Sequence, residues 1–500
     1  MRKAISAALL AVILVSFSPV SSAAQPVNLP SASAYIDVGE NGNANVTLVF
    51  SGRGFSTFWI TLPKFEKVRL CGLKGGYALY NETSGAYFYY NTTVTLHPSD
   101  DGSYELRLCF SFPYAVLMQG DRAWFMSPLL TAHSSISIAV FVKLPLLKSV
   151  VRESPSSVNQ TSDYRVYILS RTAQADLQGR VVVEYTMRSS VPSAFITSMD
   201  GRVRVEYPQP YTSIANKTLE IATQAYSQLR DLTGIEVQRV DLRFYLPEQQ
   251  MGGLGALGFV RGEDVNAGGR GPIMLNLALI RFAPGYHETT VVHEMIHVFL
   301  GAAGVEANAN TRWFHEGVAQ YVSLIVAERI GVNVSEYHRD LENGSRAVLN
   351  AYRGKLSFIE KWPSGSEEEA AAYLASYYII ANISSRYGQA SYIARLFNAL
   401  SSRGGAKTTR EIVLVMSEAT RTNLAPLFRE WGFSDIEDWQ DPLSGGVAER
   451  QLAAALVLLG IAAGALVYIL NTRVSARRLS PLIFPALLRT STSERTGTRT

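Results

Sequence analysis

The sequence predicts an α+β protein, and three regions of the 500-residue chain carry this prediction. Residues 32–190 consist of short β-branched or aromatic runs separated by Gly, Asn, Ser and Pro, which is typical of an antiparallel β-sandwich. Residues 200–440 combine a few strand-like runs with longer stretches of helical period. Residues 452–470 are nineteen consecutive uncharged residues, enough for one membrane-spanning helix.

The composition is that of a folded protein with a membrane element. Hydrophobic residues make up 47% of the chain and charged residues 18%, and the length suggests about two to four domains. The formal net charge is only +4, and Arg and Lys do not cluster into a basic patch. We therefore expect no nucleic-acid partner.

The N-terminus has the pattern of a secretory signal peptide over residues 1–24. Arg2 and Lys3 precede an apolar run over residues 4–17, and small residues lead to a signal-peptidase site after Ala24. An uncleaved N-terminal anchor is the alternative interpretation. In both cases the segment directs the chain out of the cytoplasm.

Residues 25–190 are expected to form the β-sandwich domain. The two cysteines of the chain, Cys71 and Cys109, both lie in strand-like runs of this domain. They can form one disulfide in an oxidising compartment, and two free buried thiols are the alternative. No motif in this segment is specific to one family, and a carbohydrate- or partner-binding module has the same pattern.

The second part of the chain begins with a strand, a helix and a second strand, over residues 202–207, 213–232 and 240–246. Residues 252–271 contain eight glycines. We interpret them as a mobile loop beside a cleft and not as a nucleotide-binding loop, because no clear strand and helix flank them. Residues 272–280 are then predicted to be an edge strand, of the kind that pairs with an extended substrate.

The most specific pattern of the chain is His293-Glu-Met-Ile-His297, followed after eighteen residues by Glu316. Residues four apart share one face of a helix, so His293 and His297 can bind one metal ion. With Glu316 as third ligand, these donors predict a catalytic Zn2+ site with one open position. Zinc lowers the pKa of water toward about 7, and Glu294 follows the first ligand closely enough to act as general base.

The alternative interpretation is a buried helix whose histidines are ordinary core residues. Residues 289–300 contain no Pro or Gly and favour a helix in both cases. A metzincin site is excluded, because the position six residues after His297 is Ala303 and not a third histidine. Glu316 opens a second predicted helix over residues 316–330, which favours a metal site shared by two helices.

The run His293-Glu-Met-Ile-His297 and the later run Trp-Phe-His-Glu316-Gly-Val-Ala resemble the gluzincin signature of the M1 aminopeptidase family. That family pairs HExxH with W-x-x-E-G-x-A at the same spacing. The resemblance covers about residues 200–440 and implies a thermolysin-like catalytic domain with a small mixed sheet, the active-site helix and a helical lobe. It also implies zinc-dependent peptide hydrolysis, with the two histidines and Glu316 as ligands and Glu294 as general base.

The same resemblance implies a role for Tyr373, on a predicted helix over residues 367–387. Tyr373-Leu-Ala-Ser resembles the family's Y-x-x-G element, whose tyrosine hydroxyl stabilises the oxyanion of the tetrahedral intermediate. Tyr377 and Tyr378 are alternative donors on the same helix. A purely packing role of all three rings is the alternative to any catalytic role.

The chain departs from the M1 pattern at the position that binds the substrate's α-amino group. The family carries G-x-M-E-N upstream of the zinc helix, whereas this chain has Met-Leu275-Asn, with Leu275 in place of the glutamate. Glu263 and Asp264 are nearby carboxylates that can replace it. Aminopeptidase and endopeptidase activity both stay open, and the departure favours the endopeptidase.

Residues 452–470 are predicted to be a transmembrane helix, because nineteen helical residues span about 28 Å. Three arginines follow it closely, so the positive-inside rule places the tail 471–500 in the cytoplasm and residues 25–450 outside. The sequence therefore predicts a single-pass membrane protein whose catalytic domain is extracytoplasmic.

The predicted function is a membrane-anchored zinc metallopeptidase that hydrolyses a peptide or protein substrate. The alternative is a non-catalytic cell-surface module for binding or adhesion on a peptidase-like scaffold. A metal-dependent hydrolase of other amides or esters is a third interpretation, which differs from the first only in its substrate.

Overall fold

A computed structural model of the chain describes residues 29–82, 89–133, 135–170, 179–247, 257–281 and 285–436. All of them belong to the first of two compact units, Met1–Asp438 and Trp439–Thr500. The predicted signal peptide, the predicted transmembrane segment 452–470 and the tail 471–500 lie outside the described residues.

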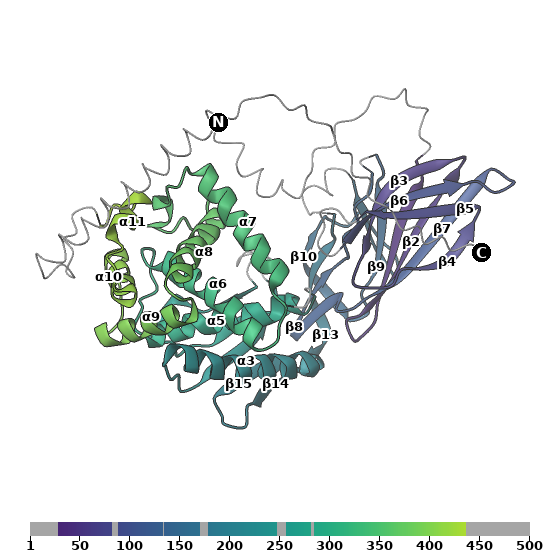
Figure 1. Cartoon of the computed structure of the whole chain (residues 1–500). Coiled ribbons are helices and arrows are strands. Elements are labelled where there is room, and N and C mark those ends of the chain that lie inside the picture. Colours follow the sequence, from purple (N-terminus) through teal and green to yellow (C-terminus); the bar gives the residue numbers. More distant parts are fainter. Residues whose placement is uncertain are drawn as a thin grey trace, which may run out of the picture. The chain divides into compact units, whose positions relative to one another are not determined.

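The largest sheet has seven strands in the order β11-β12-β9-β1-β2-β7-β4. Figure 1 labels four of them, β9, β2, β7 and β4. Its strands are β1 (Ser31–Val38), β2 (Ala44–Arg53), β4 (Arg69–Lys74), β7 (Ser103–Phe112), β9 (Ile138–Lys143), β11 (Asn159–Gln160) and β12 (Arg165–Leu169). β1 pairs with β9 in parallel, and the other neighbours pair antiparallel. Buried and accessible residues alternate along β1, β2 and β7, because one face of the sheet covers the core.

Two three-stranded sheets complete the β-rich part, with the orders β3-β6-β5 and β10-β13-β8. Their strands are β3 (Ser56–Pro63), β5 (Gly76–Glu82), β6 (Tyr89–His97), β8 (Val116–Met126), β10 (Leu147–Ser154) and β13 (Val182–Val191). Strands of all three sheets contribute to one apolar core, in which Phe58, Leu106 and Val183 are almost fully buried.

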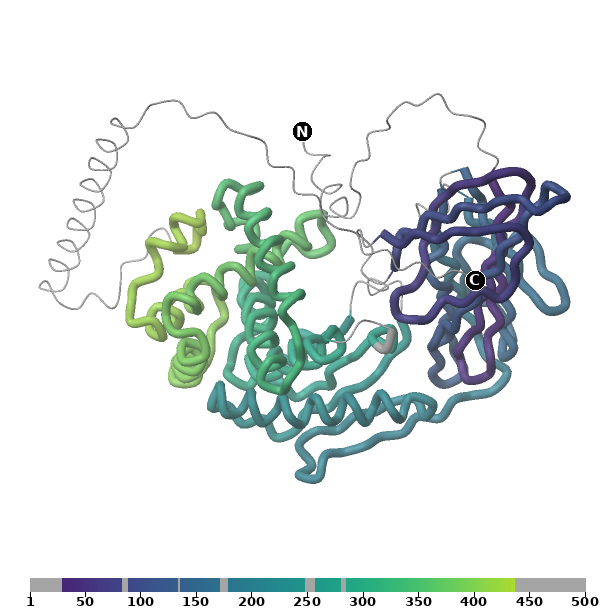
Figure 2. The backbone as a smooth tube through the Cα atoms, turned by 45° about the vertical axis from the view of Figure 1, so that its right-hand side comes forward, coloured from purple at the N-terminus to yellow at the C-terminus, as the bar shows by residue number. Residues whose placement is uncertain are grey.

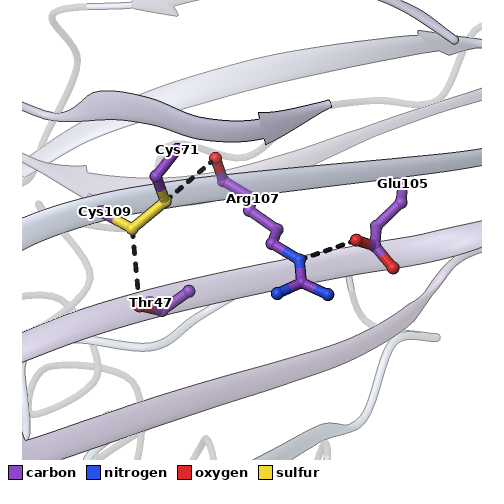
Figure 3. Close-up of a disulfide and its surroundings, with 5 residues drawn as sticks. All are labelled: Thr47, Cys71, Glu105, Arg107 and Cys109. Carbon is purple, nitrogen blue, oxygen red and sulfur yellow. Dashed lines mark hydrogen bonds and ion pairs between the residues drawn. A yellow bond between two sulfur atoms is a disulfide. The ribbon is translucent and has the colours of Figure 1, made fainter. Parts of the chain in front are cut away.

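Cys71 on β4 and Cys109 on β7 form a disulfide, and their Cα atoms lie 6.0 Å apart (Figure 3). Thr47 on the neighbouring β2 lies beside it, with its hydroxyl oxygen 3.5 Å from the sulfur of Cys109. The pairing that the sequence left open therefore links the edge strand β4 to the interior of the sheet.

The fourth sheet has the order β14-β15-β16-β18-β17. Its strands are β14 (Ser193–Thr197), β15 (Val203–Pro208), β16 (Val240–Tyr245), β17 (Gly258–Phe259) and β18 (Ile273–Asn276). β15, β16 and β18 are parallel, and the two outer strands pair antiparallel. Helix α3 (Thr212–Thr233) makes the crossover from β15 to β16 that parallel neighbours need (Figure 2).

Helices make up most of the described residues after β18. They are η4 (Leu277–Arg281), α5 (Tyr286–Ala302), α6 (Arg312–Arg329), α7 (Ser335–Ala351), η5 (Ser357–Ile359), α8 (Glu369–Arg386), α9 (Ala390–Arg403), α10 (Thr409–Thr420) and α11 (Ala425–Glu430). Two shorter helices come earlier: η1 (Gln209–Tyr211) precedes α3, and α4 (Gly262–Asn266) lies between β17 and β18. α5 packs between α3 and α6, and α8 packs on α6 (Figure 1). This central stack of α3, α5, α6 and α8 holds the candidate site.

The predicted fold class is wrong. The described residues form a mixed α/β structure with four sheets, and neither a purely antiparallel sandwich nor a thermolysin-like domain is shown. The parallel pairing of β1 with β9 escaped prediction because a strand alternates its side chains in the same way in both pairings.

The predicted edge strand over residues 272–280 is also corrected. β18 lies inside its sheet, with β16 on one side and β17 on the other. Its Ile273 and Leu275 are fully buried, and the edge is formed instead by β17 from the glycine-rich segment. Leu275, at the position compared with the family's glutamate, is thus a core residue.

The predicted single-pass anchor and the extracytoplasmic placement that follows from it are not supported. Among the helices that the structure describes, none is long and apolar enough to cross a bilayer. α3 has 22 residues, but polar and charged side chains line one of its faces.

Candidate metal centre and cleft

α5 carries the HExxH run on a helix that is buried among apolar neighbours. It begins with a capping interaction, in which the backbone N–H of Gly285 donates to Glu288 at 2.9 Å. Gly285 has a φ of 100°, which favours glycine at this turn. Met295, Ile296 and the residues of the following turn are buried, so the helix is fixed by packing on both sides of the motif.

α6 carries Glu316 and begins at Arg312, one turn earlier than the sequence predicts. The glycine that follows Glu316 allows α8 to approach closely, because a Cβ on Gly317 would lie 2.5 Å from the carbonyl oxygen of Ser376. Trp313 anchors the same turn, donating from its indole N–H to Thr409 at 3.3 Å. The W-x-x-E-G run therefore fixes Glu316 and the distance between α6 and α8.

His293, His297 and Glu316 meet between the two helices, with their ligand atoms within 4.8 Å of one another. Oε2 of Glu316 lies 3.3 Å from Nε2 of His293 and 3.7 Å from Nε2 of His297. Zinc binds such atoms at about 2.0–2.2 Å in a tetrahedron, which separates neighbouring ligands by about 3.3–3.6 Å. The two separations from Glu316 are close to that value, and the two imidazole nitrogens lie within 4.8 Å of each other, so the types and proximity of these donors suit a zinc ion.

Burial sets the charge of the groups around this centre. It lowers the pKa of His297 to about 3, so this imidazole is neutral and its lone pair is free for a metal. Burial opposes ionisation of Glu316, but the hydrogen bond with His293 and the proximity of His297, His293 and Arg312 outweigh it and lower its pKa to about 2. Burial opposes protonation of His293, but its hydrogen bond with Glu316 outweighs it and raises the pKa of this imidazole. The site thus offers a metal the neutral imidazole of His297, the imidazole of His293 and an anionic carboxylate.

Glu294 lies beside this centre, and its side chain lines the cleft. It is only 5% exposed, and burial, together with the charge of Glu316, raises its pKa to about 7 against the opposing effect of His293. The edge strand β17 passes close to it: a Cβ on Gly258 would lie 2.8 Å from Cγ of Glu294. A glycine is therefore required where the strand crosses the carboxylate.

The site opens into a cleft of about 1060 Å3. Its walls come from α5, α6, the start of α8, the edge strand β17 and the segment 307–309. Tyr286, Gln320 and Tyr337 line the cleft as well, and Gln320 donates to the Tyr337 hydroxyl at 3.0 Å. The cleft is large enough for several residues of an extended peptide.

Of the three tyrosines considered from the sequence, Tyr373 alone lines the cleft. Its hydroxyl accepts a hydrogen bond from Arg312 at 3.2 Å. Tyr377 is buried in a separate apolar cluster beside α7, and Tyr378 packs on Trp431. The geometry thus brings Tyr373 toward the metal centre and keeps the other two away.

Glu263 and Asp264 do not supply the missing anchor for an α-amino group. Glu263 is exposed and pairs with Arg261 at 3.6 Å. Asp264 packs against Gly271, where a Cβ would lie 1.8 Å from its carboxyl carbon. Neither residue lines the cleft, although both flank it on α4.

Two further histidines support α5 and α6. His287 is buried, and its Nε2 lies 2.8 Å from the Thr218 hydroxyl, which ties α5 to α3. His315 is 3% exposed, and its ring lies 5.7 Å from that of His297. Burial lowers the pKa of His315 to about 4, so it adds no positive charge beside the metal site.

Sequence reasoning missed Arg312. Its guanidinium contacts Glu316, Tyr373, Ser364 and Glu369. The signal was present, because Arg312 precedes Glu316 by four residues and so shares its helical face. It was overlooked because the predicted helix began only at Glu316.

Comparison of the chain with models of known protein families gives no match, and comparison with curated proteins gives none. The resemblance to M1 aminopeptidases therefore rests on the motif and its spacing.

Proposed function

We propose that this chain is a zinc-dependent metallopeptidase whose metal motif resembles that of the M1 aminopeptidase family. One observation carries the proposal: two imidazole nitrogens and one carboxylate oxygen converge within 4.8 Å of one another, with a second buried carboxylate beside them in an open cleft. A buried structural helix has no need for that second carboxylate, since an unpaired buried acid costs stability.

His293, His297 and Glu316 would hold the zinc ion. When bound, zinc would polarise the carbonyl group of the substrate and acidify a water molecule. Glu294 is the general base, because its carboxylate follows the first ligand on α5 and lines the cleft beside the metal site. Tyr373 is the hydrogen-bond donor for the oxygen that becomes negatively charged.

An extended peptide backbone is the substrate that this cleft suits. Among the described residues β17 is the last strand of its sheet, and Gly258 and Phe259 line the cleft, so a substrate strand can add to this edge. Glu369 is the remaining described carboxylate of the cleft, and it already accepts from Trp362 at 3.1 Å and from the Gly365 N–H at 2.8 Å. This favours cleavage within a chain over recognition of a free amino terminus.

The test uses the purified full chain. We expect one zinc per chain by elemental mass spectrometry, and hydrolysis of peptides with blocked as well as free amino termini. A chelator should abolish hydrolysis, and added zinc should restore it. Cleavage of free amino termini alone would identify an aminopeptidase whose anchor is still to be found.

A chain without stoichiometric zinc would contradict the proposal. That result would favour the alternative, a non-catalytic binding module. The exposed apolar side chains of β4 and β5, among them Leu73 and Tyr80, would then be the first surface to test.

A further inference from the structure

The two carboxylate oxygens of Glu316 have different partners. Oε2 faces both histidines, at 3.3 and 3.7 Å. Oε1 accepts a hydrogen bond from Nε of Arg312 at 3.3 Å, one turn earlier on α6. The carboxylate can therefore offer one oxygen to a metal while the other is held, and this fixes the plane of the group.

The same guanidinium reaches the Tyr373 hydroxyl, with the terminal nitrogen 3.2 Å from the phenol oxygen. Arginine has only donors, so the phenol oxygen must be the acceptor in this contact. The phenol's own hydrogen is then free to point elsewhere. Since Tyr373 lines the cleft, Arg312 leaves it prepared to donate toward a bound substrate.

Arg312 is itself held from its other side by the segment that precedes α8. The guanidinium lies 4.9 Å from the centre of the Trp362 ring and donates to the Ser364 hydroxyl at 3.2 Å. Glu369 lies 3.4 Å from it and is in turn fixed by Trp362. These contacts restrain the planar group, so its direction is set before any substrate binds.

We propose that Arg312 is a positioning residue that orients Glu316 toward the metal and the Tyr373 hydroxyl toward the substrate. The part that concerns Tyr373 rests on the proposed function, whereas the part that concerns Glu316 requires only metal binding. A lysine has a single ammonium and cannot hold two partners in one plane, so Arg312→Lys keeps the charge and loses the geometry.

The first experiment follows the rate of zinc loss to a chelator from the full chain. Arg312→Met should lose zinc about 10–100-fold faster than the natural chain, the usual effect of removing a group that holds a metal ligand. Arg312→Lys should lie between the two. Arg346→Met is the matched control, because Arg346 also pairs with a glutamate four residues away, but on the exposed face of α7.

The second experiment separates kcat from KM for a blocked peptide. We expect Arg312→Met to lower kcat by about 10–100-fold and to leave KM nearly unchanged, because the positioned groups act after binding. In the double variant with Tyr373→Phe, the loss of kcat should stay well below the product of the two single losses. Tyr373→Phe alone should leave the rate of zinc loss unchanged.

Two results would overturn the inference. In the first, Arg312→Met keeps both the rate of zinc loss and kcat within about two-fold of the natural chain. In the second, the loss of kcat in the double variant equals the product of the two single losses.

Melting of the metal-free variants shows whether folding is intact, and Arg312→Lys replaces Arg312→Met if the latter unfolds. A natural chain that binds zinc but cleaves no peptide would refute the proposed function alone, since zinc loss still decides the role of Arg312 toward Glu316.

Discussion

The core of the β-rich part and the contact between α5 and α6 bury opposite kinds of side chain. The first is built from aliphatic and aromatic residues of three sheets, such as Val94 and Leu106, which are fully buried. The second buries Glu294 and His297 on one turn of α5 and Glu316 on the facing turn of α6. Buried acids and imidazoles cost stability unless they are paired, so their concentration at one cleft supports the proposed chemistry.

The largest effect is expected from a substitution that removes a metal ligand. Glu316→Gln keeps the shape of the side chain but replaces the anionic donor with a neutral amide. We expect zinc affinity to fall more than about 100-fold, beyond the effect of losing a supporting group. Zinc titration of the metal-free chain measures this.

Glu342→Gln on the exposed side of α7 is the matched control and should bind zinc as the natural chain does. Equal affinity in Glu316→Gln would show that Glu316 is not a ligand.

A substitution in the apolar core of the β-rich part tests the other region. Leu106 is fully buried on β7, so Leu106→Ala removes three side-chain carbons and leaves a cavity. We expect the free energy of unfolding to fall by about 2–5 kcal/mol in urea, while zinc content and kcat of the folded chain stay unchanged. A change in kcat would mean that the two regions are coupled.

Gly258→Ala tests the close approach of β17 to the general base. The added methyl would lie 2.8 Å from Cγ of Glu294 and must displace it. Overpacking should lower the free energy of unfolding by about 1–3 kcal/mol. The displaced carboxylate is then out of position for proton transfer, so we expect kcat to fall by about 10-fold or more, with zinc retained.

Gly262→Ala is the control for this substitution, because its Cβ would meet Ala307 at an ordinary 3.8 Å. If Gly258→Ala kept the full activity of this control, displacement of the Glu294 side chain would not affect catalysis. That result would contradict the role of Glu294 as general base.

The smallest effect is expected on the outer face of the β-rich part. The Tyr164 hydroxyl donates to Asp37 at 2.8 Å on an exposed surface. Tyr164→Phe should lower the free energy of unfolding by only about 0.5 kcal/mol, the lower end for a net hydrogen bond. Thermal melting beside the natural chain measures it, and a loss of zinc would contradict the separation of the two regions.

Helices around the metal motif were predictable because their signal is local. Residues 289–300 lack helix breakers, and the structure has α5 over Tyr286–Ala302. The predicted helix 367–387 corresponds to α8, Glu369–Arg386. Spacing of four along a helix also predicted that His293 and His297 would share a face, and their rings lie 5.0 Å apart.

Features that depend on distant neighbours were not predictable from the pattern. The order of strands decides that Leu275 is interior and Gly258 is at the edge, and β17 has only two residues to signal this. The contacts of Arg312 with Tyr373 and Glu369 join residues about sixty positions apart, which periodicity does not reveal. The resemblance of the metal motif to the M1 family likewise did not predict the arrangement of the four sheets.

The role of Glu294 as general base is tested most directly by measuring zinc content and peptide turnover of Glu294→Gln beside the natural chain. If Glu294 is the general base, the variant keeps one zinc per chain and loses turnover by at least about 100-fold, the usual contribution of a positioned base. Turnover near that of the natural chain, with zinc in place, would contradict the proposed mechanism.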